Sequence, residues 1–524
     1  MKIWMISREY AGIAEAGGVK NVVCSLSEEL AESGNDVTLF IPQYGCTDLS
    51  CLDDYADVPD VSSLITINGR ELKVFFARAV FKGVKIVFVK SRSYEEKNNV
   101  YTYNAKDILI NPDCIVGTGY RDSLYLDVLF QKAICEYALL TGEIADVVNC
   151  HDACTASLPA IAKVLYKDCF DKTRFFVTIH NAGPAYHHEF SDINQAHAFT
   201  GLSTDVLASS LNGSRVEPYI LASYYGRLLT VSFDYASELK DFNNPNTDGL
   251  AQIFASRNIP ITGITNGIDI KRYLPEDKNV SLLPYEFSPA NKKLEGKYRC
   301  RNYFINNFAL ESMTEKTKKF YEKNLITQYG YLEPDFGNDI YISFHGRLVR
   351  QKGILVIFDL MDDILNKYSN VKFIINGQGE KLLEERSAQK AGAYPGKIVY
   401  LRGYERGLAR LCTVSGDFAL FPSEFEPCGL EDFIAQIYGT IPVAHATGGL
   451  KKIVDKETGF TYSPNTHEML FKILSELIEK KKNDSHCFDD MISHAAEYVS
   501  KNYSWETVAK EKYMKVFKED SAGN

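Results

Sequence analysis

The chain has 524 residues and a formal net charge of -10, with 45% of its residues hydrophobic and 24% charged. This length exceeds the roughly 250–300 residues at which a single core stops growing, so two domains are expected. The acidic balance argues against general nucleic-acid binding, and no segment approaches the ~20 apolar residues that a membrane helix needs. The apolar run 3–6 is too short for a signal peptide. The 12 cysteines include no C-x-x-C pair, so we expect reduced thiols, a cytoplasmic protein and no disulfide framework or zinc site.

The first forty residues predict a β-α-β unit. An apolar strand at 3–6 is followed by a Gly17-Gly18 turn, a helix with an apolar face from Val19 to Leu30, and a second strand at 37–41. A glycine pair between a strand and a helix lets backbone N–H groups approach a phosphate closely. Alone this signal is weak, because many helices begin at Gly-Gly merely to pack near a sheet.

Two later strands of the β-α alternation end in polar residues. After β-rich runs at 72–77 and 84–89 and an amphipathic helix at 128–140, a buried strand at 145–150 leads to His151-Asp152. Another strand at 175–179 leads to His180-Asn181, and a further strand follows at 228–232. The alternative interpretation of His180 is a half-buried residue at a strand end with local hydrogen bonds only.

The middle of the chain carries the signals of a domain junction. The run 243–249 is the best linker by composition, and 261–269 contains the glycines expected at a junction. The charged stretch 291–331 is rich in helix formers, and we interpret it as solvated helix, or alternatively as a surface that touches a partner.

The second half repeats the β-α alternation, with strands predicted at 340–344, 371–375 and 398–401 and a helix that extends to residue 365. Arg347 and Lys352 follow the first of these strands; they are either two surface cations or a pair that binds an anion. The Gly377-Gln378-Gly379 turn lacks the third glycine of a dinucleotide fingerprint. Tyr404 lies at a strand end suited to stacking on a base.

The run 417–431 is the most informative stretch. A buried strand at 418–421 leads through a proline-containing turn into a helix that begins at Gly429 and ends at Gly439, and Thr447-Gly448-Gly449-Leu450 begins another helix after a strand at 441–444. Two helix N-termini at one sheet edge favour an anion. Packing does not require Glu424 and Glu426 at these positions, which favours a functional role for them. The alternative is that they are two surface acids on a solvated turn.

The run from Pro422 to Leu430, Pro-Ser-Glu-Phe-Glu-Pro-Cys-Gly-Leu, resembles a segment of the bacterial glycogen synthase and plant starch synthase family. The resemblance continues through 438–443 and 447–450, through the Arg347 to Gly353 motif and through Thr-Ile-His-Asn at 178–181. The chain departs from the family pattern at three places. Glu15 stands where the family has a lysine, Ala153-Cys154 where it has Trp-His, and Glu431-Asp432 after Cys-Gly-Leu.

The resemblance implies an α/β fold of two doubly wound parallel-sheet, Rossmann-like domains that face each other across a cleft, the GT-B fold. The expected domains are an acceptor-side domain at 1–250, a donor-side domain at 251–498 and a C-terminal helix at 499–524 that crosses back to the first domain.

The resemblance also implies a retaining glucosyltransferase that moves glucose from a nucleotide diphosphate glucose, with ADP-glucose expected, to the non-reducing end of an α-1,4-glucan. No D-x-D metal motif is present, so no metal and no cofactor are expected, and neither nucleic acid nor membrane is an expected partner. The expected catalytic residues are His180, Asp152, Glu426, Arg347 and Lys352. The expected donor-binding residues are Gly17, Gly18, Arg347, Lys352, Tyr404, Glu426, Cys428, Gly429, Leu430, Thr447 and Gly448.

Two alternatives follow from the departures. One is a catalytically weak paralogue that binds glucan or nucleotide in a regulatory role, which Glu15, Ala153, Cys154 and the 291–331 stretch motivate. The other is a related two-domain glycosyltransferase with a different donor or acceptor.

Overall fold

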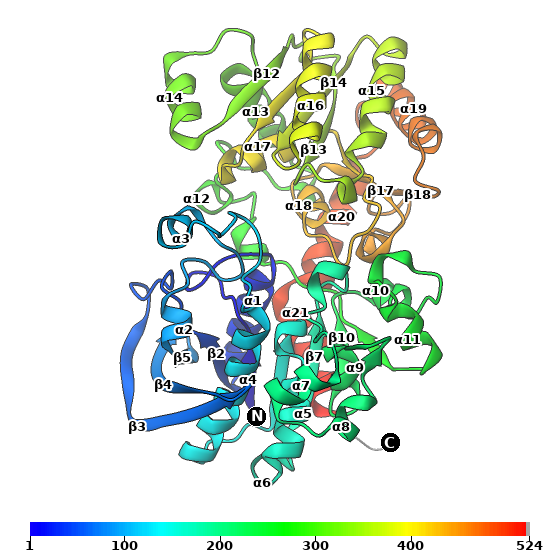
Figure 1. Ribbon diagram of the computed structural model, residues 1–524. Coiled ribbons are helices and arrows are strands. Elements are labelled where there is room, and N and C mark those ends of the chain that lie inside the picture. The colour runs from blue at the N-terminus through cyan, green and yellow to red at the C-terminus, as the bar shows by residue number, and fades with distance from the viewer. Residues whose placement is uncertain (520–524) are drawn as a thin grey trace. The chain divides into compact units, whose positions relative to one another are not determined.

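The computed structural model describes residues 1–519 and divides into two compact units (Figure 1). Unit 1 comprises Met1–Gly267 together with the described chain from Trp505 onward, and unit 2 comprises Ile268–Ser504. Each unit is an α/β structure built on a mostly parallel sheet, as the sequence predicts. Within residues 1–519, no helix is long and apolar enough to cross a membrane.

The sheet of unit 1 has nine strands in the order β11-β10-β7-β6-β1-β2-β5-β4-β3. The strands from β11 to β5 pair in parallel, and β4 pairs antiparallel with both β5 and β3. The strand bounds are β1 Lys2–Ile6, β2 Asp36–Pro42, β3 Asp53–Ile67, β4 Arg70–Phe81, β5 Val84–Lys90, β6 Val147–His151, β7 Arg174–Ile179, β10 Arg227–Thr230 and β11 Ile261–Gly263; β8 Leu211–Asn212 and β9 Arg215–Val216 form a separate hairpin.

The strand order of unit 1 reverses at β1, because the chain first builds outward through β2 and β5 and then returns to the other side of β1 with β6. Right-handed crossovers in the two directions place α1 and α4 on opposite faces of the sheet. The helices of unit 1 are α1 Val19–Glu32, α2 Arg92–Glu95, α3 Ala105–Ile110, α4 Ser123–Thr141, α5 Leu158–Leu165, α6 Lys167–Phe170, α7 Ile193–Thr200, α8 Thr204–Ala208, α9 Pro218–Ser223, α10 Phe233–Glu238 and α11 Leu250–Ser256.

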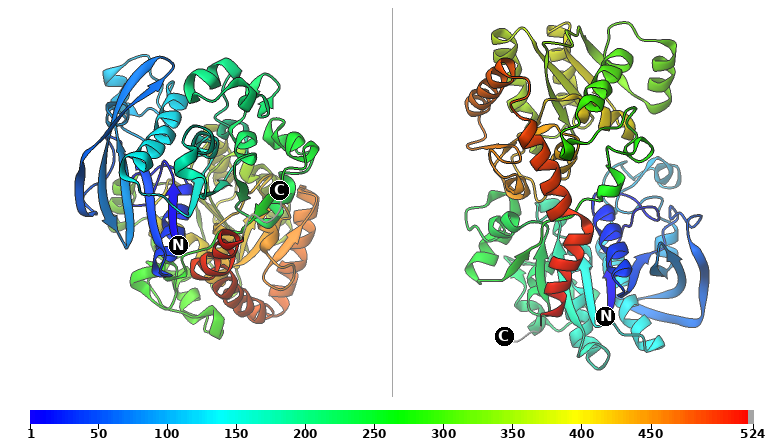
Figure 2. Two further views of the ribbon diagram at one scale, coloured as in Figure 1. Left: turned by 90° about the horizontal axis from the view of Figure 1, so that it is seen from below. Right: turned by 180° about the vertical axis from the view of Figure 1, so that it is seen from behind.

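The polar run 243–249, predicted as a linker, instead lies inside unit 1. It contains a 3₁₀ turn at Pro245–Thr247 and leads into α11 and β11, and β11 pairs with β10. The chain passes to unit 2 after Gly267. It returns at Trp505 through α21 Trp505–Thr507, a π-helical turn at Val508–Tyr513 and α22 Met514–Lys518, and this C-terminal segment lies beside α1 in Figure 2.

The sheet of unit 2 has seven strands in the order β12-β15-β14-β13-β16-β17-β18, all parallel except β12, which pairs antiparallel with β15 at the edge. The strand bounds are β12 Thr327–Leu332, β13 Ile340–His345, β14 Val371–Gly377, β15 Lys397–Arg402, β16 Phe418–Phe421, β17 Ile441–His445 and β18 Phe460–Tyr462. The helices are α12 Lys278–Ser281, α13 Glu295–Phe308, α14 Glu315–Asn324, α15 Ile354–Lys367, α16 Lys381–Ala393, α17 Arg406–Ser415, α18 Glu431–Ile437, α19 His467–Asn483 and α20 Asp489–Tyr503.

Two apolar cores lie on the two faces of this sheet. Alternate residues of a strand point to opposite faces, so Ile340, Ile342 and Phe344 of β13 enter one core while Tyr341 enters the other. The near-continuous apolar runs that predicted these strands are typical of a parallel sheet buried on both faces.

The charged stretch 291–331 is not solvated helix throughout, contrary to its composition. Helix α13 buries Lys297 and Arg301. The Lys297 ammonium donates to the carbonyls of Val414 and Gly416, and the Arg301 guanidinium donates to the Ser415 carbonyl and pairs with Asp417 at 2.8 Å. These cations therefore hold α13 against the end of α17 and the start of β16.

Candidate active site

The predicted site residues follow the strands at which each sheet reverses its order. In unit 1 the reversal lies between β1 and β6, and in unit 2 it lies between β13 and β16. In doubly wound sheets, ligands bind outside the carboxyl ends of the strands at such a point. Asp152 follows β6, Arg347 and Lys352 follow β13, and Glu426 follows β16.

Asp152 and His180 are joined in unit 1 at the ends of β6 and β7. The Asp152 carboxylate accepts a hydrogen bond from the His180 backbone N–H at 2.8 Å and from the Tyr219 hydroxyl at 3.3 Å. Asp152 adopts a φ of +63°, which is uncommon for a residue with a side chain. Strained backbone of this kind clusters at functional sites, where the surroundings hold it in place.

A buried histidine pair lies behind Asp152. The Nδ1 atom of His151 is 2.9 Å from the Nε2 atom of His180, and both side chains are buried. Burial lowers the pKa of both imidazoles, and for His151 the neighbouring His180 lowers the pKa further. Both rings are therefore neutral near pH 7, and the Nδ1 atom of His180 is the ring nitrogen not engaged by His151.

The glycine turn before α1 is bound by a carboxylate of the protein itself. Glu9 accepts hydrogen bonds from the N–H groups of Ala16 at 3.2 Å and Gly17 at 2.5 Å. Burial raises the pKa of Glu9. The anion that this turn binds in the structure is thus Glu9, while Gly18 begins α1 with open space beside its Cα.

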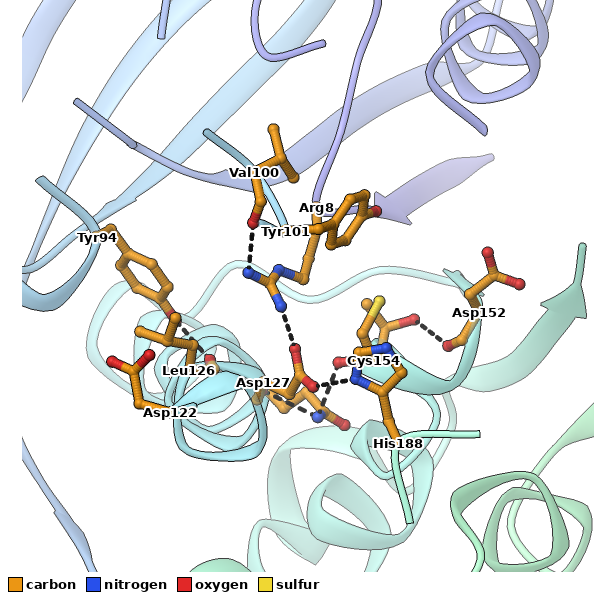
Figure 3. Close-up of polar contacts among 12 residues, drawn as sticks. Arg8, Tyr94, Val100, Tyr101, Asp122, Leu126, Asp127, Asp152, Cys154 and His188 are labelled. Carbon is orange, nitrogen blue, oxygen red and sulfur yellow. Dashed lines mark hydrogen bonds and ion pairs between the residues drawn. The ribbon is translucent and has the colours of Figure 1, made fainter. Parts of the chain in front are cut away.

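A second polar network of unit 1 centres on Arg8, which is fully buried (Figure 3). The guanidinium pairs with Asp127 of α4 at 2.6 Å and donates to the Val100 carbonyl at 2.9 Å. The other oxygen of Asp127 lies 2.7 Å from Nδ1 of His188, and Cys154 lies beside the network. The thiol at 154 is buried, and burial raises its pKa, so it is protonated and inert near pH 7.

Lys352 and Glu426 form an ion pair in unit 2. The Lys352 ammonium contacts Oε2 of Glu426, and the same oxygen accepts a hydrogen bond from the Ser423 hydroxyl at 3.1 Å. The Arg347 side chain is exposed, and it forms no hydrogen bond or ion pair with any other residue in the described range 1–519. The site therefore presents one cation that is paired with a carboxylate and one that faces solvent.

The loops that carry these residues are locked together. Gln351 accepts a hydrogen bond from the Glu424 N–H through its backbone carbonyl and donates one to the Phe425 carbonyl through its side chain. Gly353 has a φ of +68°, and a Cβ there would lie 1.8 Å from the Pro422 carbonyl oxygen. Only glycine allows this approach, so the motif from Arg347 to Gly353 fixes the position of Lys352 relative to Glu426.

The other predicted donor-binding residues lie around the same sheet edge. Cys428, Gly429 and Leu430 lead into α18, which begins at Glu431, two residues later than predicted. Tyr404 follows β15 and is 60% exposed, with its ring roughly parallel to that of His345. An exposed ring in this orientation can stack on a base.

The prediction that an α-helix begins at Thr447 and Gly448 is wrong. The segment Gly448–Lys452 is a short 3₁₀ turn, not an α-helix. Gly448 has a φ of +43°, which a right-handed α-helix cannot contain, and the Gly449 N–H donates to the Glu426 carbonyl at 2.8 Å. The backbone here therefore holds the loop that carries Glu426 by a hydrogen bond, and it provides no helix dipole.

Comparison with known proteins agrees with this geometry. Residues 2–255 match the model of the starch synthase catalytic domain, and residues 333–491 match that of the glycosyl transferases group 1. Curated glycogen synthases align along nearly their whole length. That of Thermodesulfovibrio yellowstonii is 29% identical, covering 99% of this chain and 97% of its own, and that of Streptococcus gordonii is 27% identical, covering 97% and 98%. The chain therefore contains both glycosyltransferase domains and is similar over its length to glycogen synthases.

The chain is a glycosyltransferase, and solved structures share its fold. The catalytic domain of starch synthase IV from Arabidopsis thaliana, solved with ADP and acarbose, superposes with a TM-score of 0.77 at 22% identity and covers 98% of both chains. Sucrose-phosphate synthase from Thermosynechococcus elongatus superposes with a TM-score of 0.52 at 14% identity, covering 98% of this chain and 99% of its own. The expected GT-B class of two parallel-sheet α/β domains is confirmed.

Glu15 stands at a position where the family that the sequence resembles has a lysine, and the structure shows what the Glu15 carboxylate contacts. Its carboxylate turns back to accept a hydrogen bond from the Gly12 N–H at 2.7 Å, and its other oxygen lies 3.7 Å from the Lys20 ammonium. Glu15 thus caps its own loop and has a cation beside it. Both features lower the repulsion that this carboxylate exerts on a nearby anion.

A buried ion pair lies under the loop 428–430, here called the donor loop, and it was not predicted from the sequence. The Lys452 ammonium lies 2.9 Å from Asp432 and donates to the carbonyls of Cys428, Gly429 and Gly449. Burial raises the pKa of Asp432, against the opposing charge of Lys452. Among the buried charges of the protein, Asp127 carried a sequence signal, because it interrupts the apolar run 124–130 and a charged residue there needs a buried partner.

Proposed function

We propose that this glycosyltransferase transfers glucose from ADP-glucose to the non-reducing end of an α-1,4-glucan, with retention of configuration at the anomeric carbon. The observation that supports this most is the Lys352–Glu426 pair at the point where the sheet of unit 2 reverses, five residues after the exposed Arg347. A nucleotide sugar needs both kinds of group, because the diphosphate is anionic and the sugar presents hydroxyl donors. Starch synthase IV from Arabidopsis thaliana, which shares the fold, was solved with ADP and acarbose bound.

Arg347 and Lys352 bind the diphosphate in this proposal. Arginine offers a planar fork that matches two phosphate oxygens, while lysine offers a point charge. As the bond to the sugar breaks, negative charge grows on the leaving diphosphate, and cations placed there in advance stabilise the transition state more than the ground state. When the diphosphate binds, Lys352 pairs with it instead of with Glu426. The Glu426 carboxylate then accepts hydrogen bonds from glucose hydroxyls.

The unit 1 residues bind sugar hydroxyls. His180 is neutral and offers Nδ1, and Asp152 offers Oδ2, because the bonds from His180 and Tyr219 both go to Oδ1. In unit 2, the Tyr404 ring stacks on the base, and the loop from Cys428 to Leu430 with Thr447 and Gly448 lines the donor site. Gly18 at the start of α1 offers backbone N–H groups to the phosphates, whereas the N–H of Gly17 is already bound by Glu9.

The transfer step balances without a dedicated base. The bond between the anomeric carbon and the phosphate oxygen breaks, a new bond to the acceptor 4-hydroxyl oxygen forms on the same face, and the hydroxyl proton passes to the departing diphosphate. The electron pair of the broken bond remains on the phosphate oxygen. The protein supplies position and positive charge, and these two effects provide most of the catalysis when the leaving group is a phosphate.

The test is elongation of glycogen with ADP-glucose and UDP-glucose side by side, for the wild type and Lys352→Met. The wild type is expected to incorporate glucose, with the higher kcat/KM for ADP-glucose, and Lys352→Met to lose roughly 10²-fold in turnover. Lys480→Met, an exposed lysine on α19 of the same unit, is the matched control and keeps full activity. A wild type that elongates glucan from neither donor would refute the proposal.

A further inference from the structure

Three side chains of unit 1 converge on one point outside the candidate active site. His187 directly follows the 3₁₀ turn Pro184–Tyr186, Glu189 lies two residues later, and Glu217 comes immediately before α9. The side chains are 2%, 9% and 0% exposed, respectively. One nitrogen of His187 and one oxygen from each carboxylate all lie within 4.8 Å of one another.

The converging atoms all carry lone pairs. Nε2 of His187 lies 2.9 Å from the Ala182 carbonyl oxygen, so it is the protonated nitrogen and donates there. Nδ1 of His187 then points at the two carboxylates, 3.2 Å from Oε2 of Glu217 and 3.8 Å from Oε1 of Glu189. The Arg215 guanidinium balances the charge of Glu189, so the charged, buried Glu217 carboxylate calls for a second positive group among these atoms: a proton on Nδ1 or a metal cation.

The spacing discriminates between the two. A charge-assisted N–H···O bond is about 2.7–2.9 Å long, and neither Nδ1 of His187 nor Oε2 of Glu217 has a hydrogen-bond partner of good geometry among the described residues. Around a tetrahedral zinc ion, with metal–ligand bonds of about 2.0–2.2 Å, neighbouring nitrogen and oxygen ligands are about 3.3–3.5 Å apart. The observed 3.2 and 3.8 Å bracket that separation.

The second atom of each ligand is already fixed, as in known metal sites. Besides the His187 bond to Ala182, Oε1 of Glu217 accepts from the Tyr219 N–H at 3.1 Å, and Oε2 of Glu189 pairs with Arg215 at 2.6 Å. A long bond from the Asn212 amide, 3.4 Å, reaches Oε1 of Glu189. Each side chain is therefore oriented with one atom toward the common point, and of these atoms Nδ1 of His187 and Oε2 of Glu217 accept no hydrogen bond from the described residues.

We propose that His187, Glu189 and Glu217 bind a divalent transition-metal cation of the zinc class as its three protein ligands. One imidazole and two carboxylates are a common ligand set for such an ion. The metal is structural: it fixes the loop 182–189 that follows His180 to the start of α9. The rival state is an imidazolium at His187. Although burial lowers the pKa of His187, the nearby carboxylates of Glu189 and Glu217 raise it to about 10.

The experiment uses the full chain, stripped with a chelator, and Zn²⁺ alone as the probe. Bound zinc is counted by plasma mass spectrometry, affinity is measured by competition with a chromophoric chelator, and Tm is followed by circular dichroism. The wild type is expected to bind one zinc per chain at micromolar or tighter Kd, with Tm raised by several degrees. Glu217→Gln, which keeps Oε1 for the Tyr219 N–H, is expected to weaken binding by about 100-fold or more.

The matched control is His486→Gln, because His486 is an exposed histidine that also faces a carboxylate, Asp489 at 2.7 Å. Loss of binding in this variant, or zinc uptake by Glu217→Gln equal to that of the wild type, would place the ion elsewhere and overturn the proposal. Absence of stoichiometric zinc in the wild type would overturn it in favour of the imidazolium. If Glu217→Gln does not fold, the visible absorption spectrum of Co²⁺ bound to the wild type is the deciding measurement. An intense band, as for a tetrahedral site of nitrogen and oxygen ligands, supports the proposal. A weak octahedral spectrum refutes it.

Discussion

Replacing Lys452 by methionine tests whether the buried ion pair stabilises unit 2 and the donor loop together. Methionine keeps most of the length and apolar volume of the lysine stem but removes the ammonium. The side chains of Lys452 and Asp432 are 3% and 0% exposed. Three backbone carbonyls, those of Cys428, Gly429 and Gly449, lose their donor at the same time.

The expected loss of stability is about 3–5 kcal/mol, because removing one partner of a buried pair leaves the other charge uncompensated. An exposed ion pair would contribute only about 0–1 kcal/mol. The double variant Lys452→Met/Asp432→Asn removes the orphaned charge as well, so we expect it to regain a large part of the loss. The carbonyls at 428 and 429 border the loop that binds the donor in our proposal, so KM for ADP-glucose is expected to rise in the single variant more than kcat falls.

Urea unfolding followed by circular dichroism is the appropriate assay, because both tryptophans, Trp4 and Trp505, lie in unit 1 and report poorly on unit 2. Lys451→Met, at the exposed neighbouring position, is the matched control. A loss below about 1 kcal/mol for Lys452→Met, or a double variant less stable than the single one, would refute the reasoning.

Three further predictions concern the other buried charges and the Glu15 turn. Arg301→Met, which leaves the buried Asp417 carboxylate before β16 with Lys481 at 3.8 Å as its remaining cation, is expected to destabilise unit 2 by about 1.5–3 kcal/mol in the same unfolding assay, and a change under about 1 kcal/mol would show that α13 is not held by this pair. Glu15→Lys is expected to change KM for ADP-glucose with little change in kcat in initial-rate assays; activity that appears only in this variant would favour the regulatory paralogue. Because burial lowers the pKa of His151 below the unfolded value of about 6.5, the wild type is expected to lose stability as pH falls through 6.5, by up to about 1.4 kcal/mol per pH unit for each proton taken up. His151→Asn is expected to make that slope shallower in urea titrations at pH 5–7, and an unchanged slope would contradict the assignment.

The strands and main helices could be predicted because their signals are local. Apolar runs of four to six residues bounded by turn residues located most strands of both parallel sheets, and the strand predicted at 418–421 matches β16. The antiparallel strands β3 and β12 were not predicted, because their half-exposed residues give no strong periodicity. The Thr447 turn was predicted as a helix because its glycines resemble a helix start; a tertiary bond to the Glu426 carbonyl decides otherwise.

In the candidate site, too, features with a local sequence signal were predicted, and contacts between distant segments were not. The family motifs at the strand ends predicted Asp152, His180, Lys352 and Glu426 as site residues, but the contacts of Asp152 with His180 and of Lys352 with Glu426 come from the structure. Pairings between distant segments, such as Arg301 with Asp417, could not be predicted, because no local pattern says which buried charge meets which. The binding of the Gly17 N–H by Glu9 escaped prediction for the same reason.

Mass-resolved elongation of maltoheptaose tests the central claim most directly. The wild type is incubated with ADP-glucose carrying ¹³C at the anomeric carbon, and the products are read by mass spectrometry and by NMR of the new linkage. Our account predicts a ladder of products that each gain one glucose, joined by α-1,4 bonds at the non-reducing end, with ADP released in equal amount. Release of ADP without elongation, a β-linked product, or no reaction with any nucleotide glucose would contradict it.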